Sequence, residues 1–476
     1  MPGPLKRLFA VESLIGSIPV QGDLPTTREA YRDLAQIALP SVLEMVLTSL
    51  IGSIDTMMVG TLGSTAIAAV GLVGQPRMLM LSLFFALNIG VTAVVARRKG
   101  EGRQADANRT LRSAIVMMLA LSGVLMSILI PLARPLMAFA GAMPDTIDYS
   151  TTYFRILGWV LPLNALSMGI NAAQRGVGNT RITMYCNVTA NLVNVLFNYL
   201  LIGGNLGFPA LGVAGAAYAT AIGFTVGFIM AVTALVRGGM RGDFLHVHLT
   251  DNWKPDGECL KSVLKVGGNA MIEQVALRIG FFSYAKIVAS LGTISFAAHQ
   301  ICAQFLNLSF TFADGVGVAG TSLVGQMLGR RRPDLSTIYG KCAQRMAFVI
   351  SLVLASAVAL LRGPAIGLFL SEADENAEAV RQIAMQVMLI VALFQPFQMS
   401  SVVISGCLRG AGDNRFVAGV MMACVMCLRP LMALTAVHVL HLGLAGAWMA
   451  SLIDMTIRMI LVMRRFAGGK WHAIKV

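Results

Sequence analysis

The stretch LAQIALPSVLEMVLTSLIGSIDTMM, residues Leu34–Met58, decides the fold that the sequence predicts. It is apolar and long enough to cross a bilayer, since a span needs about 20 residues. It also carries two carboxylates, Glu44 and Asp55, and an ionisable group within a membrane helix by default marks an ion or substrate pathway. Part of the stretch recurs at Leu264–Leu291, where Glu273 takes the place of Glu44. The sequence therefore predicts two copies of one helix bundle, with acidic residues facing a cavity between them.

The composition excludes a water-soluble protein. Hydrophobic residues make up 56% of the 476 residues, charged residues make up 13%, and the mean hydropathy is +0.72. Soluble domains carry about 25% charged residues. The net charge of +14 fits lysines and arginines that hold membrane loops on the cytoplasmic side, rather than a nucleic-acid interface. The expected partners therefore include a lipid bilayer and no nucleic acid.

Apolar runs fill the chain and predict twelve transmembrane helices. Their expected ranges are 34–58, 68–96, 111–133, 150–173, 181–203, 211–236, 262–290, 296–326, 343–366, 378–406, 415–439 and 442–465. Lys and Arg gather in the loops after every second helix, whereas the alternate loops are poor in them. By the positive-inside rule, this alternation places both termini in the cytoplasm.

An internal repeat divides the predicted helices into two sets of six. LGSTAIAAVG at Leu62 returns as LGTISFAAHQ at Leu291, and LGVAGAA at Leu211 returns as LGLAGAW at Leu442. A near-constant offset over an even number of helices indicates two copies of the same topology, with a site between them near mid-membrane. The predicted fold class is an all-α integral membrane protein of two pseudo-symmetric six-helix bundles. The predicted parts are a cytoplasmic segment 1–33, an N-lobe 34–236, a cytoplasmic linker 237–261, a C-lobe 262–465 and a cytoplasmic tail 466–476.

Asp55 and Glu273 are the leading candidates for ion coupling. Asp55 lies among small and polar residues, which suggests an interior face with room for water or an ion. A buried carboxylate there can bind and release a proton, or help to coordinate Na⁺; the alternative is a structural carboxylate at a helix end. Glu273 is either a second such group or one half of an ion pair, for which Arg278 and Lys286 are the candidate partners.

Amide side chains form a polar stripe on the predicted fifth helix. Asn187, Asn191, Asn194 and Asn198 are spaced four, three and four residues apart, so they share one helix face. These amides are candidates for ligating Na⁺ or for hydrogen-bonding an acidic partner. The alternative is that they hold neighbouring helices together.

Further residues are candidates for the wall of a substrate cavity. Gln398 and Asn164 lie beside prolines at equivalent places in the two copies, which suggests cavity walls or hinges. Tyr284 occupies the repeat position of Asp55. The full set of cavity candidates is Glu44, Tyr284, Gln398, Asn164 and Arg278. Other charged residues fall within predicted spans, and the sequence leaves their pairing open: Arg77, Arg155, Asp314, Arg429 and Asp454.

Motifs of enzymes and ATP-driven pumps are absent from the sequence. There is no P-loop GxxxxGK[ST], no HExxH and no pattern of a catalytic triad. We therefore expect neither an enzyme, nor a cofactor, nor a structural metal. Two fused halves in one chain favour alternating access over a channel, because channels usually build a pore from several subunits.

The chain also resembles the MATE (multidrug and toxic compound extrusion) transporters over nearly all of its length. The motifs that carry the resemblance are Ala38-Leu-Pro, Asp55-Thr-Met-Met-Val-Gly, Leu211-Gly-Val-Ala-Gly-Ala-Ala, Ala297-Ala-His-Gln and Leu408-Arg-Gly-Ala-Gly-Asp. The family implies two six-helix lobes in a V shape. It also implies export of organic cations and other amphipathic compounds in exchange for H⁺ or Na⁺.

The resemblance implies roles for individual residues. Asp55 falls on the ion-coupling aspartate of helix 1, and Glu273 resembles the helix 7 glutamate of the NorM-like branch. Asn194 and Asn198 fall on the polar pair of helix 5, where the DinF-like branch has Asp at the second position. Gln398 replaces the helix 10 aspartate of the NorM-like branch. The implied ion-coupling residues are thus Asp55, Glu273, Asn194 and Asn198, and Na⁺, if it is the coupling ion, would bind Asp55 with the two amides.

The sequence as a whole predicts a monomeric secondary antiporter in the inner membrane of a bacterium, with a small, cationic, amphipathic substrate. Two alternatives stay open. A flippase or exporter of a lipid-linked or anionic metabolite would require a cavity rich in arginine, for which Arg77, Arg155 and Arg278 are available. A membrane sensor or scaffold without transport is disfavoured by the duplication and by the lack of a stretch long enough for a soluble domain.

Overall fold

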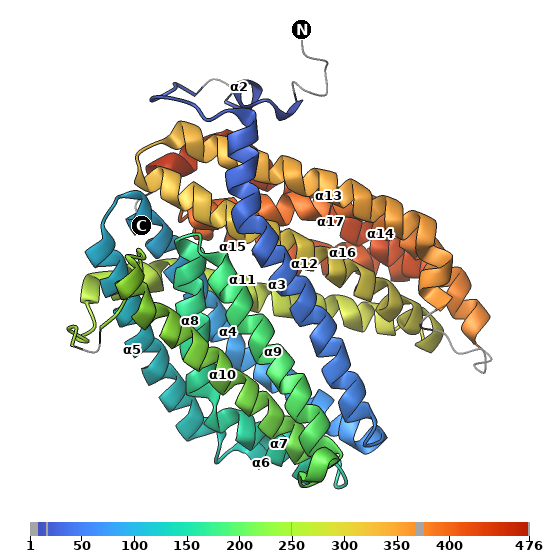
Figure 1. The fold of residues 1–476 in the computed structure, drawn as a ribbon. Coiled ribbons are helices and arrows are strands. Elements are labelled where there is room, and N and C mark those ends of the chain that lie inside the picture. The colour runs from blue at the N-terminus through green and yellow to red at the C-terminus, as the bar shows by residue number, and fades with distance from the viewer. Residues whose placement is uncertain (1–7, 16–17, 249, 368, 370–375, 475–476) are drawn as a thin grey trace. The chain divides into compact units, whose positions relative to one another are not determined.

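The computed structural model describes residues 8–15, 18–248, 250–367, 369 and 376–474, and this part of the chain is built from helices and contains no strand (Figure 1). The chain forms two compact units. Unit 1 comprises Met1–Val42 and Ile272–Val476, and unit 2 comprises Leu43–Met271. The unit boundaries fall inside helices α3 (Thr27–Gly60) and α11 (Gly257–Ala289), so each of these helices contributes to both units.

Unit 2 holds the helices of the first repeat. Besides its share of α3 and α11, these are α4 (Ser64–Gly100), α5 (Gln104–Leu129), α6 (Ala133–Phe139), α7 (Ile147–Trp159), α8 (Leu161–Gly176), α9 (Thr180–Ile202), the short η1 (Asn205–Gly207) and α10 (Gly212–Arg241). Its apolar core includes Val59, Tyr153, Phe154 and Ala217. The described charged loop after α10 is tied to α5, since Arg112 forms an ion pair with Asp251 at 2.6 Å.

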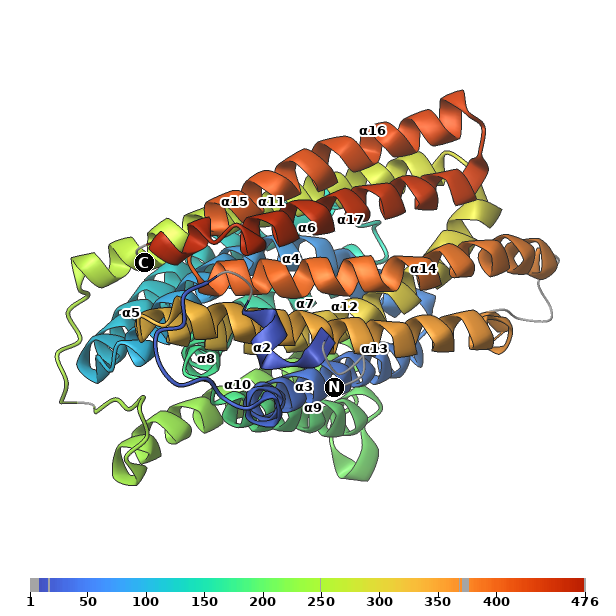
Figure 2. The ribbon, with the colours of Figure 1, turned by 90° about the horizontal axis from the view of Figure 1, so that it is seen from above.

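Unit 1 holds the second repeat. Besides its share of α3 and α11, its helices are α2 (Val11–Leu14), α12 (Thr293–Gly329), α13 (Pro333–Gly367), α14 (Ala377–Gly410), α15 (Asn414–Met421), η2 (Met422–Leu428), α16 (Arg429–Leu434), η3 (Thr435–Val439), α17 (Gly443–Ala467) and η4 (Lys470–Ala473). Helix α14 packs against α12, α13 and α17 (Figure 1, Figure 2). Small residues permit the close approach of α12 and α14, and Thr321 Oγ1 of α12 donates a hydrogen bond to Gly406 O of α14 at 2.8 Å.

Two predicted spans are less regular than the sequence suggested. The span predicted at 150–173 is a pair of helices, α7 and α8, that meet at 52°. Pro162 lies in the first turn of α8, where its missing N–H is tolerated, so a new helix starts there. The span predicted at 415–439 contains two π-helical stretches, η2 and η3, on either side of Pro430.

The all-α membrane fold predicted from the sequence is confirmed. Ten helices in the described part of the chain are long and apolar enough to cross a membrane, and the bent pair of α7 and α8 makes eleven. Helix α11 covers the seventh predicted span, 262–290, but it is not among them. It has the length, with 33 residues, but polar and charged side chains such as Lys265, Glu273 and Arg278 lower its hydropathy.

Candidate functional site

Asp55 of α3 and two amides of α9 come together in unit 2. Asn198 donates a hydrogen bond from Nδ2 to Asp55 Oδ1, and the same nitrogen lies 3.5 Å from Asn194 Oδ1. Asn194 in turn donates to Thr220 Oγ1 of α10 at 3.1 Å. The spacing of four residues places both amides on one face of α9. Asp55 is partly exposed, whereas Asn194 and Asn198 are buried.

Three further residues surround this carboxylate. Arg77 of α4 interacts electrostatically with Asp55, and its guanidinium lies over the Phe224 ring at 5.6 Å from the centroid. Tyr153 of α7 is buried and lies beside Thr220. Of these, only Arg77 stood out in the sequence, as a charge within a span. Tyr153 and Thr220 belong to no motif and sit in different helices, so no pattern could have singled them out.

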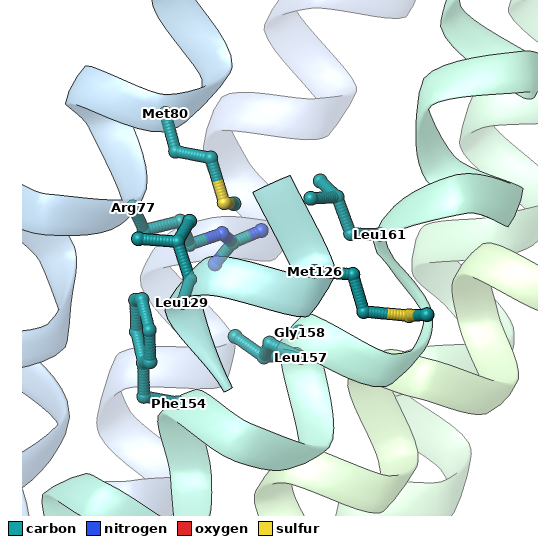
Figure 3. A pocket seen from close by; sticks show the side chains of 8 residues that line it. All are labelled: Arg77, Met80, Met126, Leu129, Phe154, Leu157, Gly158 and Leu161. Carbon is teal, nitrogen blue, oxygen red and sulfur yellow. The ribbon is translucent and has the colours of Figure 1, made fainter. Parts of the chain in front are cut away.

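A small pocket adjoins Arg77 in unit 2. Its lining comes from α4, α5, α7 and α8 and consists of Arg77, Met80, Met126, Leu129, Phe154, Leu157, Gly158 and Leu161 (Figure 3). Apart from the one guanidinium, the lining is apolar. The pocket has room for about one water molecule. It is therefore a gap between helices rather than a site for a larger ligand.

Glu44 lies on the same helix as Asp55 but in different surroundings. Eleven residues separate the two carboxylates, which is about 16 Å along a helix axis. Glu44 is buried and accepts hydrogen bonds from Arg175 Nη2 at 2.5 Å, Thr183 Oγ1 at 2.9 Å and Asn187 Nδ2 at 2.6 Å. All three donors belong to the end of α8 or the start of α9. Glu44 is thus fixed as a fully bonded carboxylate.

Glu273 is fixed in a similar way in unit 1. It is fully buried and is bound by Arg409 of α14, which donates from both Nε and Nη2. The expectation that Arg278 or Lys286 would pair with Glu273 was wrong. Arg278 lies five residues on, about 140° around the helix axis from Glu273, and it is exposed. Arg409 instead reaches Glu273 from a different helix, α14.

The remaining cavity candidates occupy different environments. Tyr284 is buried in the apolar core of unit 1, and its ring lies 5.8 Å from that of His299. Gln398 is fully buried on α14, and neither of its amide atoms has a hydrogen-bond partner in the described part of the chain. Asn164 of α8 is half-buried in unit 2, and Arg278 is exposed in unit 1.

The remaining charged residues whose pairing the sequence left open either lie in a buried ion-pair cluster or are exposed. In unit 1, Asp454 of α17 accepts from Arg429 at 2.7 Å and from Arg458 at 3.3 Å, and all three side chains are buried. Asp314 of α12 is exposed and interacts electrostatically with the pair of Glu273 and Arg409. Arg155 of α7 is exposed in unit 2.

The donor set around Asp55 suits a proton or a hard monovalent cation. The described residues contain no group of three or more His, Cys, Asp or Glu side chains that could hold a metal ion. Carboxylate and amide oxygens are ligands of hard cations. Asn198 Oδ1 is buried and has no hydrogen-bond partner among the described residues, so one amide oxygen beside Asp55 is left without a bond.

A family model, curated relatives and a solved structure all point to one family of proteins. The family model MatE matches residues 40–200 and 270–435. The chain is 28% identical over 453 residues to the Thermotoga maritima protein "Probable multidrug resistance protein NorM", which covers 93% of this chain and 94% of that protein. It is 27% identical over 442 residues to "Multidrug resistance protein MdtK" of Pectobacterium atrosepticum, over 91% and 94% of the two chains. A solved outward-facing multidrug resistance MATE family transporter of the MOP superfamily has the same fold, with a TM-score of 0.85, 21% identity and 99% coverage of both chains.

Proposed function

Because the chain belongs to the MatE family, we propose that it is a secondary antiporter that exports organic cations or other amphipathic small molecules in exchange for H⁺ or Na⁺. Two relatives are named as multidrug resistance proteins, which supports the substrate class. The bacterial relatives and the long apolar helices support a multi-pass protein of the inner membrane. The basic loops support cytoplasmic placement of both termini.

The cluster around Asp55 is the observation that carries this proposal. Asp55 is partly exposed and has one bonded oxygen, whereas Glu44 and Glu273 are buried and bonded to arginine. A carboxylate that is already paired with an arginine is less available to an ion than Asp55 is. Asp55 is therefore the carboxylate that we assign to ion coupling, with Asn194 and Asn198 as its supports.

The free oxygen of Asn198 gives the cluster two ways to bind an ion. A proton would neutralise Asp55 and leave the hydrogen bond from Asn198 in place. A Na⁺ ion would recruit the carboxylate together with amide oxygens, for which Asn198 would turn its side chain. In both cases the ion removes a negative charge beside Arg77. Export follows if the ion and the substrate favour opposite conformations of the protein, since only differential binding can shift such an equilibrium.

Asp55 supports a cationic substrate. It is partly exposed, and its negative charge would attract a cation when no ion is bound, so substrate and ion would compete for one carboxylate.

Efflux from liposomes tests the proposed function. The protein would be reconstituted into liposomes that are loaded with a fluorescent organic cation. A pH gradient and a Na⁺ gradient would then be imposed in separate experiments. We expect one gradient to drive efflux in the wild type and neither gradient to drive it in Asp55→Asn. Efflux by Asp55→Asn at the wild-type rate would refute the assignment of Asp55, and failure of both gradients to drive the wild type would refute antiport of organic cations.

A matched control separates coupling from a general loss of surface charge. Asp148→Asn removes a carboxylate at the start of α7, where Asp148 forms an exposed ion pair with Arg134 at 2.6 Å. Exposed pairs of this kind contribute about 0–1 kcal/mol. The control variant should therefore transport like the wild type under the gradient that drives it.

A further inference from the structure

Helix α14 carries a buried polar stripe in unit 1. Gln395, Gln398, Ser401 and Ser405 follow one another at intervals of three or four residues and lead to Arg409. At about 100° per residue, these positions lie on one side of the helix. The four side chains from Gln395 to Ser405 are 0–1% exposed, so the stripe faces the interior of the unit.

The stripe is short of hydrogen bonds. Both amide atoms of Gln395, both amide atoms of Gln398 and the hydroxyls of Ser401 and Ser405 have no partner among the described residues. A buried polar atom without a partner costs about 1–3 kcal/mol. Buried polar groups in proteins are satisfied by protein or by ordered water in the large majority of cases. A run of such atoms on one helix side therefore indicates a bound ligand that makes these bonds.

The other sides of α14 are closed by protein. On one side, Gln344 Nε2 of α13 donates to Ser400 Oγ at 3.1 Å. On another, Thr321 of α12 donates to Gly406 O. The stripe lies on the remaining side, which faces α17. Phe394 lies about 20° around the helix from Ser401 and from Ser405, and it packs with an apolar cluster from α17.

The stripe ends at the buried charges of unit 1. Arg409 binds Glu273, and Arg458 of α17 interacts electrostatically with the same glutamate. On α17, Asp454 Oδ1 and Arg458 Nε are also buried and without a hydrogen-bond partner in the described part of the chain. Buried polar atoms without hydrogen-bond partners are therefore found both on α14 and in the neighbouring charged cluster of α17.

We propose that unit 1 contains a track of bound water along α14, from Gln395 to the pair of Glu273 and Arg409. The stripe itself consists of amides and hydroxyls, which donate and accept hydrogen bonds and carry no net charge. Water matches this chemistry, because a buried water typically makes about three hydrogen bonds with partners of both kinds. The stripe itself contains no carboxylate for a cation, and Glu273 at its end is bound by Arg409.

The first repeat contains a related polar stripe on α8. Asn164, Ser167 and Asn171 lead to Arg175 on α8 with the spacing of Gln398, Ser401, Ser405 and Arg409 on α14. There, Asn171 Nδ2 donates to Asn187 Oδ1 at 3.3 Å, and Asn187 donates to Glu44. Direct bonds between side chains thus satisfy part of the stripe in unit 2, whereas Asn171 Oδ1 and Arg175 Nε are buried there without a partner among the described residues. The proposal is independent of the coupling ion and of the substrate.

X-ray radiolysis in H₂¹⁸O tests for the track, because hydroxyl radicals formed from bound water oxidise only side chains next to it. A Ser405→Cys variant places a reactive thiol on the stripe. Cys407 of the same peptide is the internal control, since it is fully buried, lies about 200° around the helix, and would touch a Cβ at Gly320 at 2.7 Å. We expect the introduced thiol to gain ¹⁸O several-fold faster than Cys407. Equal, slow labelling of both thiols would overturn the proposal.

A second variant ties the labelling to the polar groups of the stripe. Gln398→Met keeps the length of the side chain and removes both hydrogen-bonding ends. In the Ser405→Cys background, we expect it to lower the labelling of the introduced thiol several-fold without raising the melting temperature. Unchanged labelling together with a higher melting temperature would show that Gln398 was dry and unsatisfied, which contradicts the track. Ser401→Cys replaces Ser405→Cys if the latter fails to fold, and neither readout involves transport.

Discussion

The two units share one ion pair. In unit 2, Arg175 at the end of α8 binds Glu44, and in unit 1, Arg409 at the end of α14 binds Glu273. The glutamates occupy equivalent repeat positions, and so do the arginines. Each glutamate lies within two residues of the point where its helix passes from one unit to the other. The duplicated bundle therefore fastens α3 and α11 at the same place by the same chemistry.

The two units differ at the next acidic position. Asp55 sits among amides in unit 2 and is partly exposed, whereas its repeat equivalent in unit 1, Tyr284, is buried in an apolar core. Two carboxylates of one helix can therefore have different roles. Glu44 belongs to an ion pair that has an equivalent in the other copy, and Asp55 belongs to the site that we propose for ion coupling.

The largest difference in effect is expected between separate substitutions at these two equivalent positions. Asp55→Asn should reduce gradient-driven efflux from liposomes to the level without protein, because it removes the carboxylate that we assign to ion coupling. Tyr284→Phe should leave efflux near the wild-type rate, because it removes only a hydroxyl in a packed core. If Tyr284→Phe abolished efflux while Asp55→Asn retained it, the assignment of the two positions would be reversed.

The next largest effect should follow from breaking the pair in unit 1. Arg409→Met leaves the buried Glu273 without its bonded partner, and loss of one member of a buried pair costs about 3–5 kcal/mol. We expect a loss of this size in the free energy of unfolding in detergent micelles. The double variant Arg409→Met with Glu273→Met should recover most of it, because no buried charge is left unpaired. A loss below about 1 kcal/mol, the range of exposed pairs, would show that Glu273 is solvated.

The matching change in unit 2 should be milder. Arg175→Met leaves Glu44 with hydrogen bonds from Thr183 and Asn187. We expect a loss of about 1–3 kcal/mol, the range for one hydrogen bond to a buried group. The measurement is the same unfolding experiment. Adding Thr183→Val should increase the loss, and equal losses for Arg175→Met and Arg409→Met would refute the claimed difference between the units.

Periodicity and repetition predicted the features that depend on one helix or on the comparison of two copies. Asn194 and Asn198 lie four residues apart, and their meeting with Asp55 needed only that α9 present this face to α3. The duplication also carries information on the pairing of charged residues. The RGxG motifs at Arg175 and Arg409 occupy equivalent places in the two copies, as do Glu44 and Glu273, so knowledge of either ion pair would have predicted the other.

Features that depend on packing between helices were out of reach of the sequence. The partner of Glu273 was sought on the same helix, whereas Arg409 arrives from a helix more than a hundred residues away in the chain. The bend at Val160 needed the knowledge that Pro162 starts a new helix rather than kinking an old one. Thr220 and Tyr153 join the Asp55 cluster only because α10 and α7 pack beside α9 and α4.

The two units should also respond to acid in different pH ranges. In unit 1, burial lowers the pKa of His472 below its ordinary value of 6.5, and its ring nitrogen Nε2 lies 3.1 Å from Thr337 Oγ1. In unit 2, hydrogen bonds from the His248 backbone N–H and from Arg112 lower the pKa of Asp251 below its ordinary 3.8. The folded tail therefore resists protonation of His472, and the folded loop resists protonation of Asp251.

The smallest predicted effect is a local loosening of the C-terminal tail at mildly acidic pH. A histidine with a lowered pKa binds fewer protons in the folded than in the unfolded state, so stability falls as the pH drops through 6.5 toward the folded pKa. The contribution of Asp251 is present above 3.8 and is lost only below it. Between pH 7.5 and pH 5, hydrogen exchange corrected for its intrinsic pH dependence should thus accelerate at residues 470–474 and stay constant at residues 250–256. His472→Gln should remove the acceleration, and equal acceleration in both segments would contradict the separate origins that the two pKa shifts imply.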